Sequence, residues 1–453
     1  MNAKIPRLMI AGTGSGCGKT TVCCAVLKAL SARGMNLGAF KCGPDYIDTM
    51  FHERILGKPS SNLDAFFFSA DTLKALLAKN AAPDINIIEG VMGFYDGLGI
   101  DSAAASSYEI ARITQTPVIL VLNAKGSALS LLAQISGFLD FLPNNHIIGV
   151  ILNRCNAMTY PRLAQAIRQH FGEKIIPLGF LPDLPDCTLE SRHLGLVTAQ
   201  EVKGLDEKLK RLAEQAERTL DLDQLILSAQ NAGEISFEPL HIQHFPEKIR
   251  IAAAQDRAFC FYYHDNFDLL REMGAEIVPF SPISDMNLPE NIHGIYLGGG
   301  YPELYTEELS HNIGMRKAVC DAVSAGLPCI AECGGFMYLT ESINGLPMAG
   351  VLPGNCYNTG KLTRFGYVTL KAKRDNLLCE QGAVIAAHEF HYWDCGEPGA
   401  DFTAEKVSGK SWKCVHASGS LYAGFPHFHF YANPDFAVRF YKACLNYKES
   451  HHA

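Results

Sequence analysis

The sequence predicts an α/β fold in two domains, each built on a mostly parallel sheet flanked by helices. Two glycine-rich turns, near residues 12 and 333, each follow an apolar strand and precede a helix-like run. Short apolar strands separated by helix-length segments are typical of parallel sheets covered on both faces. A chain of 453 residues also exceeds one ordinary core. We expect domains at 1–232 and 248–453, joined by a linker at 233–247 where regular periodicity stops.

Composition narrows the class of protein. Hydrophobic residues make up 48% and charged residues 19%, as in soluble globular proteins. The net charge of −8 gives no reason to expect nucleic acid or a membrane as partner, and no apolar stretch is long enough to span a bilayer. The first apolar strand follows the N-terminal residues directly, so we expect this segment to belong to the fold and expect no secretion signal. The fifteen cysteines are therefore expected to be reduced thiols in a cytoplasmic protein.

The first glycine-rich turn has the layout of a phosphate-binding P-loop. A strand at 8–11 leads into the run Gly-Thr-Gly-Ser-Gly-Cys-Gly-Lys-Thr-Thr, and a helix-like run at 22–32 follows. Glycines let backbone N–H groups turn toward phosphate oxygens, while Lys19 can reach the β- and γ-phosphates and the Thr20 hydroxyl can bind Mg²⁺. The residues expected to bind ATP are Gly12, Thr13, Gly16, Gly18, Lys19, Thr20 and Thr21. Thr13 stands where the common spacing has a glycine, which here comes one residue earlier.

Acidic residues follow two of the next strands. Asp45 and Asp48 come after a short strand at 37–41, with Tyr46 between them. Ligands of open α/β sheets bind beyond the carboxyl ends of strands, so these residues either hold Mg²⁺ or order a substrate, or form an Asp-rich turn. Glu89 ends an apolar strand at 85–88, which is the position that anchors the metal in P-loop proteins, and we expect it to join Thr20 there.

Two later segments of the first domain add candidates. Asn153 ends the strand at 147–152, and its amide could read the adenine edge. Arg192 and His193 follow the last expected strand, at 178–182. They belong either to a substrate loop with cationic groups or to a surface turn. Residues 201–230 are charged, with leucines at helical spacing.

The α/β pattern restarts after the linker. Strands are expected at 250–254, 276–280, 294–297 and 328–331, with helices at 263–273 and in the stretch that ends near Gly326. Cys333 then stands on a strand-to-helix turn between glycines, as a nucleophile does in a nucleophile elbow. Its place at a helix N-terminus is expected to lower the pKa of the thiol. The N–H groups of Gly299, Gly300 and Gly334 could form an oxyanion hole.

A thiolate nucleophile needs a base. His427 and His429 alternate with apolar residues, so they are expected on one side of a strand. A second histidine cluster, at 388–391, either serves the cysteine or lines the other substrate site.

Ten stretches together carry a resemblance to a known family. They are, in chain order, GTGSGCGKT, KCGPDYID, NLD, EGVMGFYDG, RHLGL, GGGYPE, ECGGFMYL, RFGYV, HEFHY and HFHF. Over nearly its full length the chain resembles the cobyrinic acid a,c-diamide synthases. That family joins a dethiobiotin-synthetase-like P-loop domain to a flavodoxin-like class I glutamine amidotransferase domain. Its members use ATP and glutamine to convert the a and c acetate carboxylates of a cobalt–corrin precursor to amides.

The resemblance implies roles at matching positions. Gly18, Lys19 and Thr20 would hold ATP and Mg²⁺, with Glu89 at the metal. Asp45 and Asp48 would serve the corrinoid or the metal. Cys333 would form the glutamyl thioester, with His427 as its base. The broader class has a glutamate two places after that histidine; here the place belongs to His429, so which imidazole faces the thiol stays open.

The chemistry follows from the same resemblance. Transfer of the ATP γ-phosphoryl group to a carboxylate makes an acyl phosphate, and ammonia released from glutamine must reach it as NH₃, by a shielded path between the domains. The expected partners are ATP, L-glutamine and cobyrinic acid or a related tetrapyrrole, and a homodimer is left open. Nickel-sirohydrochlorin or hydrogenobyrinic acid are alternative substrates. A P-loop nucleotide switch with an inert amidotransferase-like module is the alternative from another class.

Overall fold

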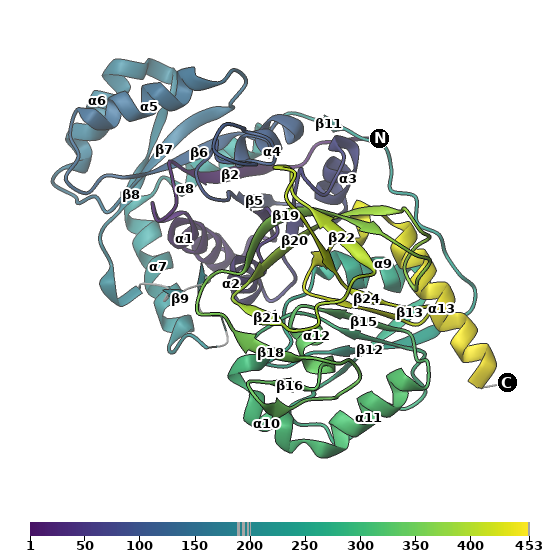
Figure 1. Cartoon of the computed structure of the whole chain (residues 1–453). Coiled ribbons are helices and arrows are strands. Elements are labelled where there is room, and N and C mark those ends of the chain that lie inside the picture. The colour runs from purple at the N-terminus through teal and green to yellow at the C-terminus, as the bar shows by residue number, and fades with distance from the viewer. Residues whose placement is uncertain (188–190, 193–194, 197–198, 200, 452–453) are drawn as a thin grey trace. The chain divides into compact units, whose positions relative to one another are not determined.

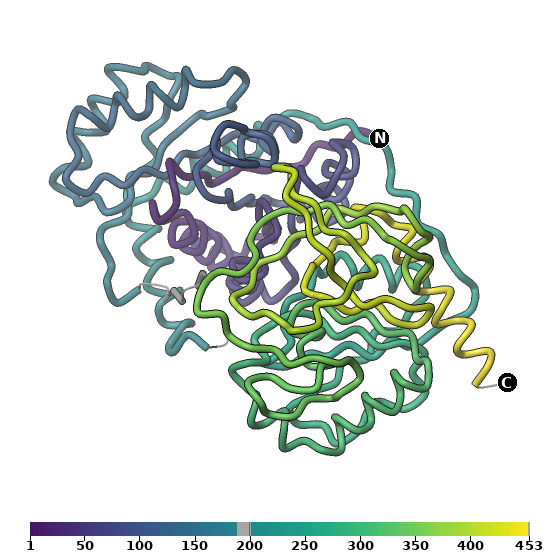
Figure 2. The backbone as a smooth tube through the Cα atoms, viewed as in Figure 1, coloured from purple at the N-terminus to yellow at the C-terminus, as the bar shows by residue number. Residues whose placement is uncertain are grey.

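The computed structural model describes residues 1–187, 191–192, 195–196, 199 and 201–451. The chain divides into two compact units, Met1–Leu240 and His241–Ala453 (Figures 1 and 2). This division falls inside the segment 233–247 that we propose as the linker. Within the described ranges, no helix combines the length and the apolar character that a membrane crossing requires.

The sheet of unit 1 is parallel throughout. In the part of this unit that is described, it has seven strands with nearly continuous burial, as expected for apolar strands covered by helices. Their spatial order is β4 (Ser61–Leu63), β3 (Leu37–Cys42), β5 (Ile85–Glu89), β2 (Arg7–Gly12), β6 (Val118–Asn123), β7 (Ile147–Asn153) and β8 (Ile176–Leu181). The carboxyl ends of all these strands therefore meet at one edge, where the P-loop lies.

Helices alternate with these strands along the chain. They are α1 (Lys19–Ala32), α2 (Ile47–Leu56), α3 (Ala70–Asn80), α4 (Ser107–Thr114), α5 (Ser130–Phe141), α6 (Tyr160–Phe171), α7 (Leu205–Thr219) and α8 (Leu222–Gln230). The side chain of Asp221 accepts the N–H of Gln224 and so caps α8, which explains why the helical segment predicted at 201–230 is two helices. The short strands β9 (Ser191–Arg192) and β10 (Gly195–Leu196) pair in antiparallel fashion.

The two ends of unit 1 lie side by side (Figure 2). Strand β1 (Asn2–Ala3) pairs with β11 (Ile235–Ser236), and the N-terminal ammonium of Met1 donates to the carbonyl of Phe237 at 2.7 Å. The fully buried guanidinium of Arg7 donates to the carbonyls of Thr114 and Gly233. Burial lowers the pKa of Arg7 to about 10.

Unit 2 contains a second helix-flanked sheet that is parallel except at one edge strand. Its spatial order, within residues 241–451, is β13 (Ala275–Phe280), β12 (Ile249–Ala254), β14 (Gly294–Leu297), β15 (Cys329–Glu332), β25 (Leu421–Gly424) and β24 (His416–Ala417), with β24 antiparallel. The main helices are α9 (His264–Met273), α10 (Thr306–His311), α11 (Ile313–Ser324), α12 (Gly334–Leu339) and α13 (Asp435–His451). An apolar cluster that includes Ile295, Val319 and Phe336 packs α11 and α12 on this sheet.

Two smaller sheets complete unit 2. One is antiparallel, in the order β23 (Ser411–Cys414), β22 (Phe402–Glu405), β19 (Arg364–Ala372), β20 (Val384–His391) and β26 (His427–Phe428). The other joins β17 (Leu346–Pro347), β16 (Ser342–Ile343), β18 (Asn355–Asn358) and β21 (Trp393–Cys395). The predicted fold class is confirmed, because each unit contains a mostly parallel, helix-flanked sheet. The two smaller sheets of unit 2 were not predicted.

Candidate functional site

The P-loop connects β2 to α1 and is shaped by close contacts. Gly18 has φ 99° in the left-handed region, and a Cβ placed on it would lie 1.9 Å from Nδ2 of Asn153. A Cβ on Gly12 would lie 2.3 Å from Sγ of Cys17. Gly16 is also left-handed, with φ 74°. Glycine is therefore required at both ends of the loop, where a side chain would collide with the groups that fold it.

Lys19 begins α1 and reaches back over the loop. Its Nζ donates to the carbonyl of Gly14 at 3.2 Å, and the side chain is buried. Burial lowers the pKa of Lys19, and the nearby charge of Lys41 acts in the same direction. A phosphate in the loop would supply the negative charge that favours the ammonium form. Thr13 lies in the same loop, where its N–H donates to Val121 at 3.3 Å, and Thr21 lies in the first turn of α1.

Thr20 and Glu89 come together as the sequence predicts. The Thr20 hydroxyl donates to Oε1 of Glu89 at 2.6 Å. Nζ of Lys41, at the end of β3, is 3.1 Å from the same Oε1 and 2.5 Å from Oδ2 of Asp48. Burial opposes the charge on Lys41, but the two carboxylates outweigh it and raise the pKa of Lys41. The result is a cluster at the carboxyl edge of the sheet, in which a partly buried hydroxyl meets a buried carboxylate and a buried ammonium.

His52 lies on the other side of Glu89. Its Nε2 is 2.7 Å from Oε2 of Glu89, and its Nδ1 is 3.1 Å from the hydroxyl of Ser60. That hydroxyl is also 3.0 Å from the carbonyl of Ala39, and a carboxylate beside Nε2 only accepts, so Nε2 of His52 donates to Glu89. Burial alone would raise the pKa of Glu89, but Lys41 and the hydrogen bond from His52 lower it below its usual range. Glu89 is thus held as an ionised carboxylate.

The donor set of this cluster suits Mg²⁺. A threonine hydroxyl and ionised carboxylates are hard oxygen ligands of the kind that Mg²⁺ binds together with phosphate oxygens. Thr20 and Glu89 meet this description. Asp45 is engaged differently, since its Oδ1 accepts the N–H groups of Ile47 and Asp48 at the start of α2. Its metal and substrate roles stay predictions.

The remaining predicted residues of unit 1 have varied positions. Tyr46 is buried, and its carbonyl accepts from the Thr49 hydroxyl. Asn153 ends β7, and its Nδ2 donates to the carbonyl of Cys17 at 2.9 Å, which ties it to the P-loop; its contact with adenine stays a prediction. Arg192 belongs to the backbone of β9, and His193 lies outside the described residues.

In unit 2, Cys333 stands on a strained turn. It has φ 48° and ψ −101°, between the end of β15 and the start of α12, and its N–H donates to the carbonyl of Gly424 at 2.7 Å. A non-glycine residue held in such a conformation is typical of functional sites. Burial raises the pKa of the Cys333 thiol, and Glu303 adds to the effect. The expected lowering by the helix N-terminus is thus wrong, because burial outweighs the hydrogen bond from Gly334.

The predicted glycines lie at this turn. A Cβ on Gly334 would be 3.1 Å from the N atom of Gly300, and a Cβ on Gly299 would be 2.4 Å from Cε1 of His427. The carbonyl of Gly299 accepts from the N–H groups of Cys260 and Phe261, each at 3.0 Å. The Gly299–Gly300 segment therefore borders both the nucleophile turn and an imidazole.

The two histidines expected on one strand have different partners. His427 lies in β26, and its Nδ1 is 3.2 Å from Oε2 of Glu332. His429 lies beyond the strand, where its Nδ1 accepts the N–H of Tyr431 and its Nε2 faces Asp265 at 3.8 Å. His429 thereby caps a short 3₁₀ turn, Phe430–Ala432. This arrangement favours His427 as the base.

The competing cluster lies on β20. His388 pairs with His427 across β20 and β26, with ring centroids 5.0 Å apart, and its Nε2 is 2.8 Å from the Tyr263 hydroxyl. Burial, then the charge of His427, lowers the pKa of His388 well below its ordinary value. His391 contacts Glu389 through Nε2 at 3.0 Å and the Trp393 carbonyl through Nδ1 at 2.6 Å. Both ring nitrogens of His391 are therefore used within the fold.

Sequence reasoning missed Lys41, His52 and Glu332. Lys41 ends a predicted strand at the ligand edge of the sheet, which is a signal that could have found it. Glu332 directly precedes the nucleophile. His52 lies inside a helix without a motif, so only the folded geometry brings it to Glu89.

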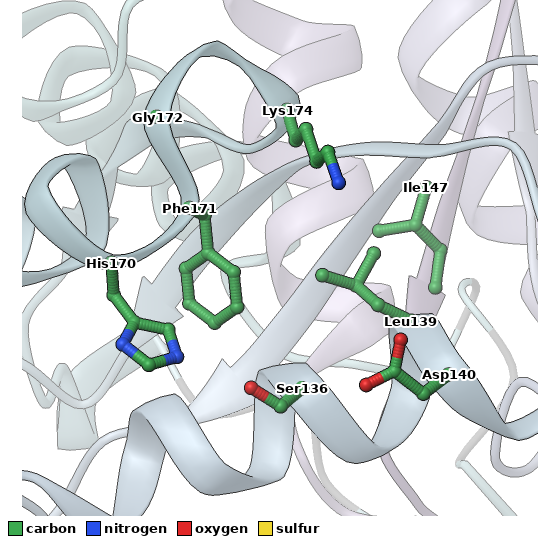
Figure 3. A pocket seen from close by; sticks show the side chains of 8 residues that line it. All are labelled: Ser136, Leu139, Asp140, Ile147, His170, Phe171, Gly172 and Lys174. Atoms are coloured by element: carbon green, nitrogen blue, oxygen red, sulfur yellow. The ribbon is translucent and has the colours of Figure 1, made fainter.

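A separate pocket of about 760 Å³ lies in unit 1 (Figure 3). It is lined by Ser136, Leu139, Asp140, Ile147, His170, Phe171, Gly172 and Lys174. Ile147 begins β7 and Lys174 precedes β8, so the pocket lies at the amino edge of the sheet, opposite the P-loop. No predicted site residue among those described lines it.

Comparison with known proteins matches both units. Residues 8–197 match the CobQ/CobB/MinD/ParA nucleotide-binding domain, and residues 250–435 match the CobB/CobQ-like glutamine amidotransferase domain. A cobyrinate a,c-diamide synthase of Clostridium acetobutylicum is 40% identical over 435 residues, covering 95% of this chain and 98% of the relative. Proteins of the same name from Listeria monocytogenes serotype 4b and Limosilactobacillus reuteri are each 38% identical, covering 94% and 96% of this chain and 97% and 98% of the relatives. The chain therefore belongs to the cobyrinate a,c-diamide synthase family.

Proposed function

We propose that this chain is an ATP- and glutamine-dependent amidoligase of cobalamin biosynthesis that converts the a- and c-acetate carboxylates of cobyrinic acid to amides. Membership of the family supports the reaction class. The observation that carries glutamine use is the backbone of Cys333, whose φ of 48° fixes a thiol at a strand-to-helix turn beside the glycine segment 299–300.

Unit 1 would energise the carboxylate. A carboxylate is a poor acyl electrophile, so its oxygen attacks the γ-phosphorus of ATP, giving an acyl phosphate and ADP. The P-loop N–H groups and Lys19 would bind the phosphates, and Thr20 and Glu89 would hold Mg²⁺. The bound ion would neutralise phosphate charge. Lys41 and His52 keep Glu89 ionised and fixed in place.

Unit 2 would release the nitrogen. Sγ of Cys333 attacks the carboxamide carbon of glutamine, and the thiol proton passes to His427, which returns it to the departing NH₃. N–H groups at Gly299, Gly300 and Gly334 would stabilise the oxyanion. Water then hydrolyses the glutamyl thioester to glutamate. The NH₃ attacks the acyl phosphate, and phosphate leaves as the amide forms.

The tetrapyrrole is tested directly with the full chain. Cobyrinic acid, hydrogenobyrinic acid and nickel-sirohydrochlorin are each incubated with ATP and glutamine, and mass spectrometry counts the carboxylic acids that become amides. We expect two such changes on cobyrinic acid. If only one of the other two acids is amidated, that acid and not cobyrinic acid is the substrate. Slow ATP hydrolysis that no tetrapyrrole stimulates would favour a nucleotide switch.

Replacing the nucleophile should separate the two nitrogen sources. In Cys333→Ser we expect glutamine-dependent amidation to fall by at least about 10³-fold, because serine in this buried site is a much weaker nucleophile. Amidation with ammonium chloride should continue. Cys320→Ser, a partly exposed thiol on α11, is the control and should behave like the parent. Equal use of glutamine by Cys333→Ser would remove Cys333 from the role.

Replacing the P-loop lysine should abolish amidation but leave glutamine hydrolysis. In Lys19→Ala we expect amidation to be lost with either nitrogen source, because the ammonium that contacts the phosphates is gone. Glutamine hydrolysis should remain measurable. Lys28→Ala, on the same helix, is the matched control. Normal amide formation in Lys19→Ala would rule out this phosphate site.

A further inference from the structure

The carboxylate of Glu332 joins the residue before the nucleophile to the proposed base. Its Oε2 lies 3.2 Å from Nδ1 of His427, and its Oε1 accepts the hydroxyl of Tyr296 at 3.0 Å. Glu332 is 2% exposed and His427 is 3% exposed. We propose that Glu332 is a positioning residue for glutamine hydrolysis, which fixes the tautomer and the ring orientation of His427. This inference rests on the proposed roles of Cys333 and His427.

The tautomer follows from the partners of the carboxylate. An ionised carboxylate only accepts hydrogen bonds, so Nδ1 of His427 carries the proton and Nε2 is the nitrogen that takes the thiol proton. Burial and the charge of Glu332 raise the pKa of Tyr296 well above its ordinary value, so the phenol keeps its proton and donates it to Oε1. Both oxygens of Glu332 are then accounted for.

The ring orientation puts Nε2 beside the glycine segment. A Cβ on Gly299 would lie 3.3 Å from Nε2 of His427, and the next residue, Gly300, has its N atom 3.1 Å from the Cβ position of Gly334. Glycine at 299 therefore makes room for the imidazole on the same two-residue segment that borders the nucleophile turn. Asn266 holds the segment after His427, since it donates to the carbonyl of Phe428 and accepts the N–H of Phe430.

Glu332 also supplies an acid that is missing two residues after the proposed base. The residue two positions after His427 is His429, which faces Asp265 and the N–H of Tyr431. The acid is supplied instead by the end of β15, directly before Cys333. The same strand end thus provides the nucleophile and the group that orients its base. During thiol attack, the proton on Sγ moves to Nε2, and Glu332 stabilises the resulting imidazolium without taking a proton itself.

Unit 2 offers a matched control for this contact. Glu389 and His391 form a second buried pair at 3.0 Å. Nδ1 of His391 lies 2.6 Å from the carbonyl of Trp393, so neither ring nitrogen of this pair is directed to a thiol. Glu389→Gln changes the same chemical group in the same kind of pair, without touching His427.

The experiment measures glutamine hydrolysis and amidation by the full chain. In Glu332→Gln the amide would accept from Tyr296 and donate toward Nδ1, which favours the unproductive tautomer. We expect kcat for glutamine hydrolysis to fall on the order of 10²- to 10⁴-fold, with KM for glutamine within threefold and ammonia-dependent amidation retained. Glu389→Gln should change kcat by less than about tenfold, and Glu332→Asp should recover part of the loss.

A double variant distinguishes positioning from general damage. His427→Asn keeps a donor near Glu332 but lacks the base, and adding Glu332→Gln to it should cause no further loss if Glu332 acts only through His427. Additive losses, an equal loss in Glu389→Gln, or a Glu332→Gln enzyme within tenfold of the parent would each overturn the inference. The Cys333→Ser variant is measured alongside. If it still hydrolyses glutamine, the proposed role of Cys333 is wrong, and this result is distinct from a failure of the positioning role of Glu332.

Discussion

At the scale of single residues, Gly299 leaves no room for a side chain beside the proposed base. A Cβ there would lie 2.4 Å from Cε1 of His427 and 3.3 Å from its Nε2. No real Cβ approaches a ring atom this closely, so an added methyl group must displace either the imidazole or the strand end that bears it. Glycine is thus required at 299 by the closeness of the His427 ring and not by the shape of the turn.

Gly299→Ala is therefore expected to disable glutamine hydrolysis. Displacement of His427 should lower kcat for glutaminase by at least about tenfold, since small errors in the position of a catalytic group carry large rate penalties. Amidation with ammonium chloride should be retained. Gly419→Ala is the control, because nothing lies within 4 Å of a Cβ at 419. Parent-like glutaminase in Gly299→Ala would mean that His427 tolerates the methyl group or has no part in the reaction.

The same scale shows what sequence can and cannot supply at the site. Thr20 and Glu89 are predicted to meet because Thr20 follows the P-loop lysine and Glu89 ends the strand whose last residue anchors the metal in P-loop proteins; the Thr20 hydroxyl and Oε1 of Glu89 lie 2.6 Å apart. His52 and Glu332 were not predicted. No motif signals either pairing, although the partner of His52 is only 37 residues away, closer than the 69 residues between Thr20 and Glu89. Contacts set by motif spacing were predictable, whereas contacts set by packing needed the fold.

At the scale of elements, apolar runs were the dependable signal. The strands expected at 85–88 and 294–297 are β5 and β14, because a strand buried on both faces is apolar at almost every position. The antiparallel sheet of unit 2 had no such signal. In β19 the first half of the strand is exposed or partly buried, and buried and exposed residues alternate only from Val368 to Ala372, so no continuous apolar run marks the strand.

The end of β26 illustrates a further limit. His427 and His429 have the spacing of two residues on one face of a strand, but the strand ends at Phe428 and a 3₁₀ turn follows. The alternation therefore stops between them, and they turn to Glu332 and Asp265 respectively. A period of two predicts a shared face only while the strand continues.

At the scale of the whole molecule, buried thiols are a common feature of both units. All fifteen cysteines are free, and burial raises the pKa of many of them. These are Cys23, Cys24, Cys42, Cys155, Cys187, Cys329, Cys333, Cys379, Cys414 and Cys444. For Cys42 the value is raised to about 12. The folded chain thus keeps thiol protons that an unfolded chain would release in mildly alkaline solution.

The free energy of unfolding should consequently fall as the pH rises through about 8.5, the ordinary thiol value. Above that value the unfolded state binds fewer protons than the folded state, so alkali favours unfolding. Urea unfolding followed by circular dichroism, in the presence of a reducing agent, would measure this at neutral pH and about one unit above the thiol value. Cys444→Ala should show a smaller decrease. A constant or increasing stability over this interval would contradict the prediction.

The closure of unit 1 has a consequence for how such a protein can be encoded. Its first strand pairs with β11, and Arg7 joins the start of the sheet to Gly233, so the first residues of the proposed linker at 233–247 are bound to unit 1. The two ends of unit 1 are thus joined by strand pairing and hydrogen bonds before unit 2 begins. A polypeptide that ends at residue 240 would still contain both paired strands and the Arg7 contact. A gene fusion or fission at this point would therefore leave the contacts between the two ends of unit 1 unchanged.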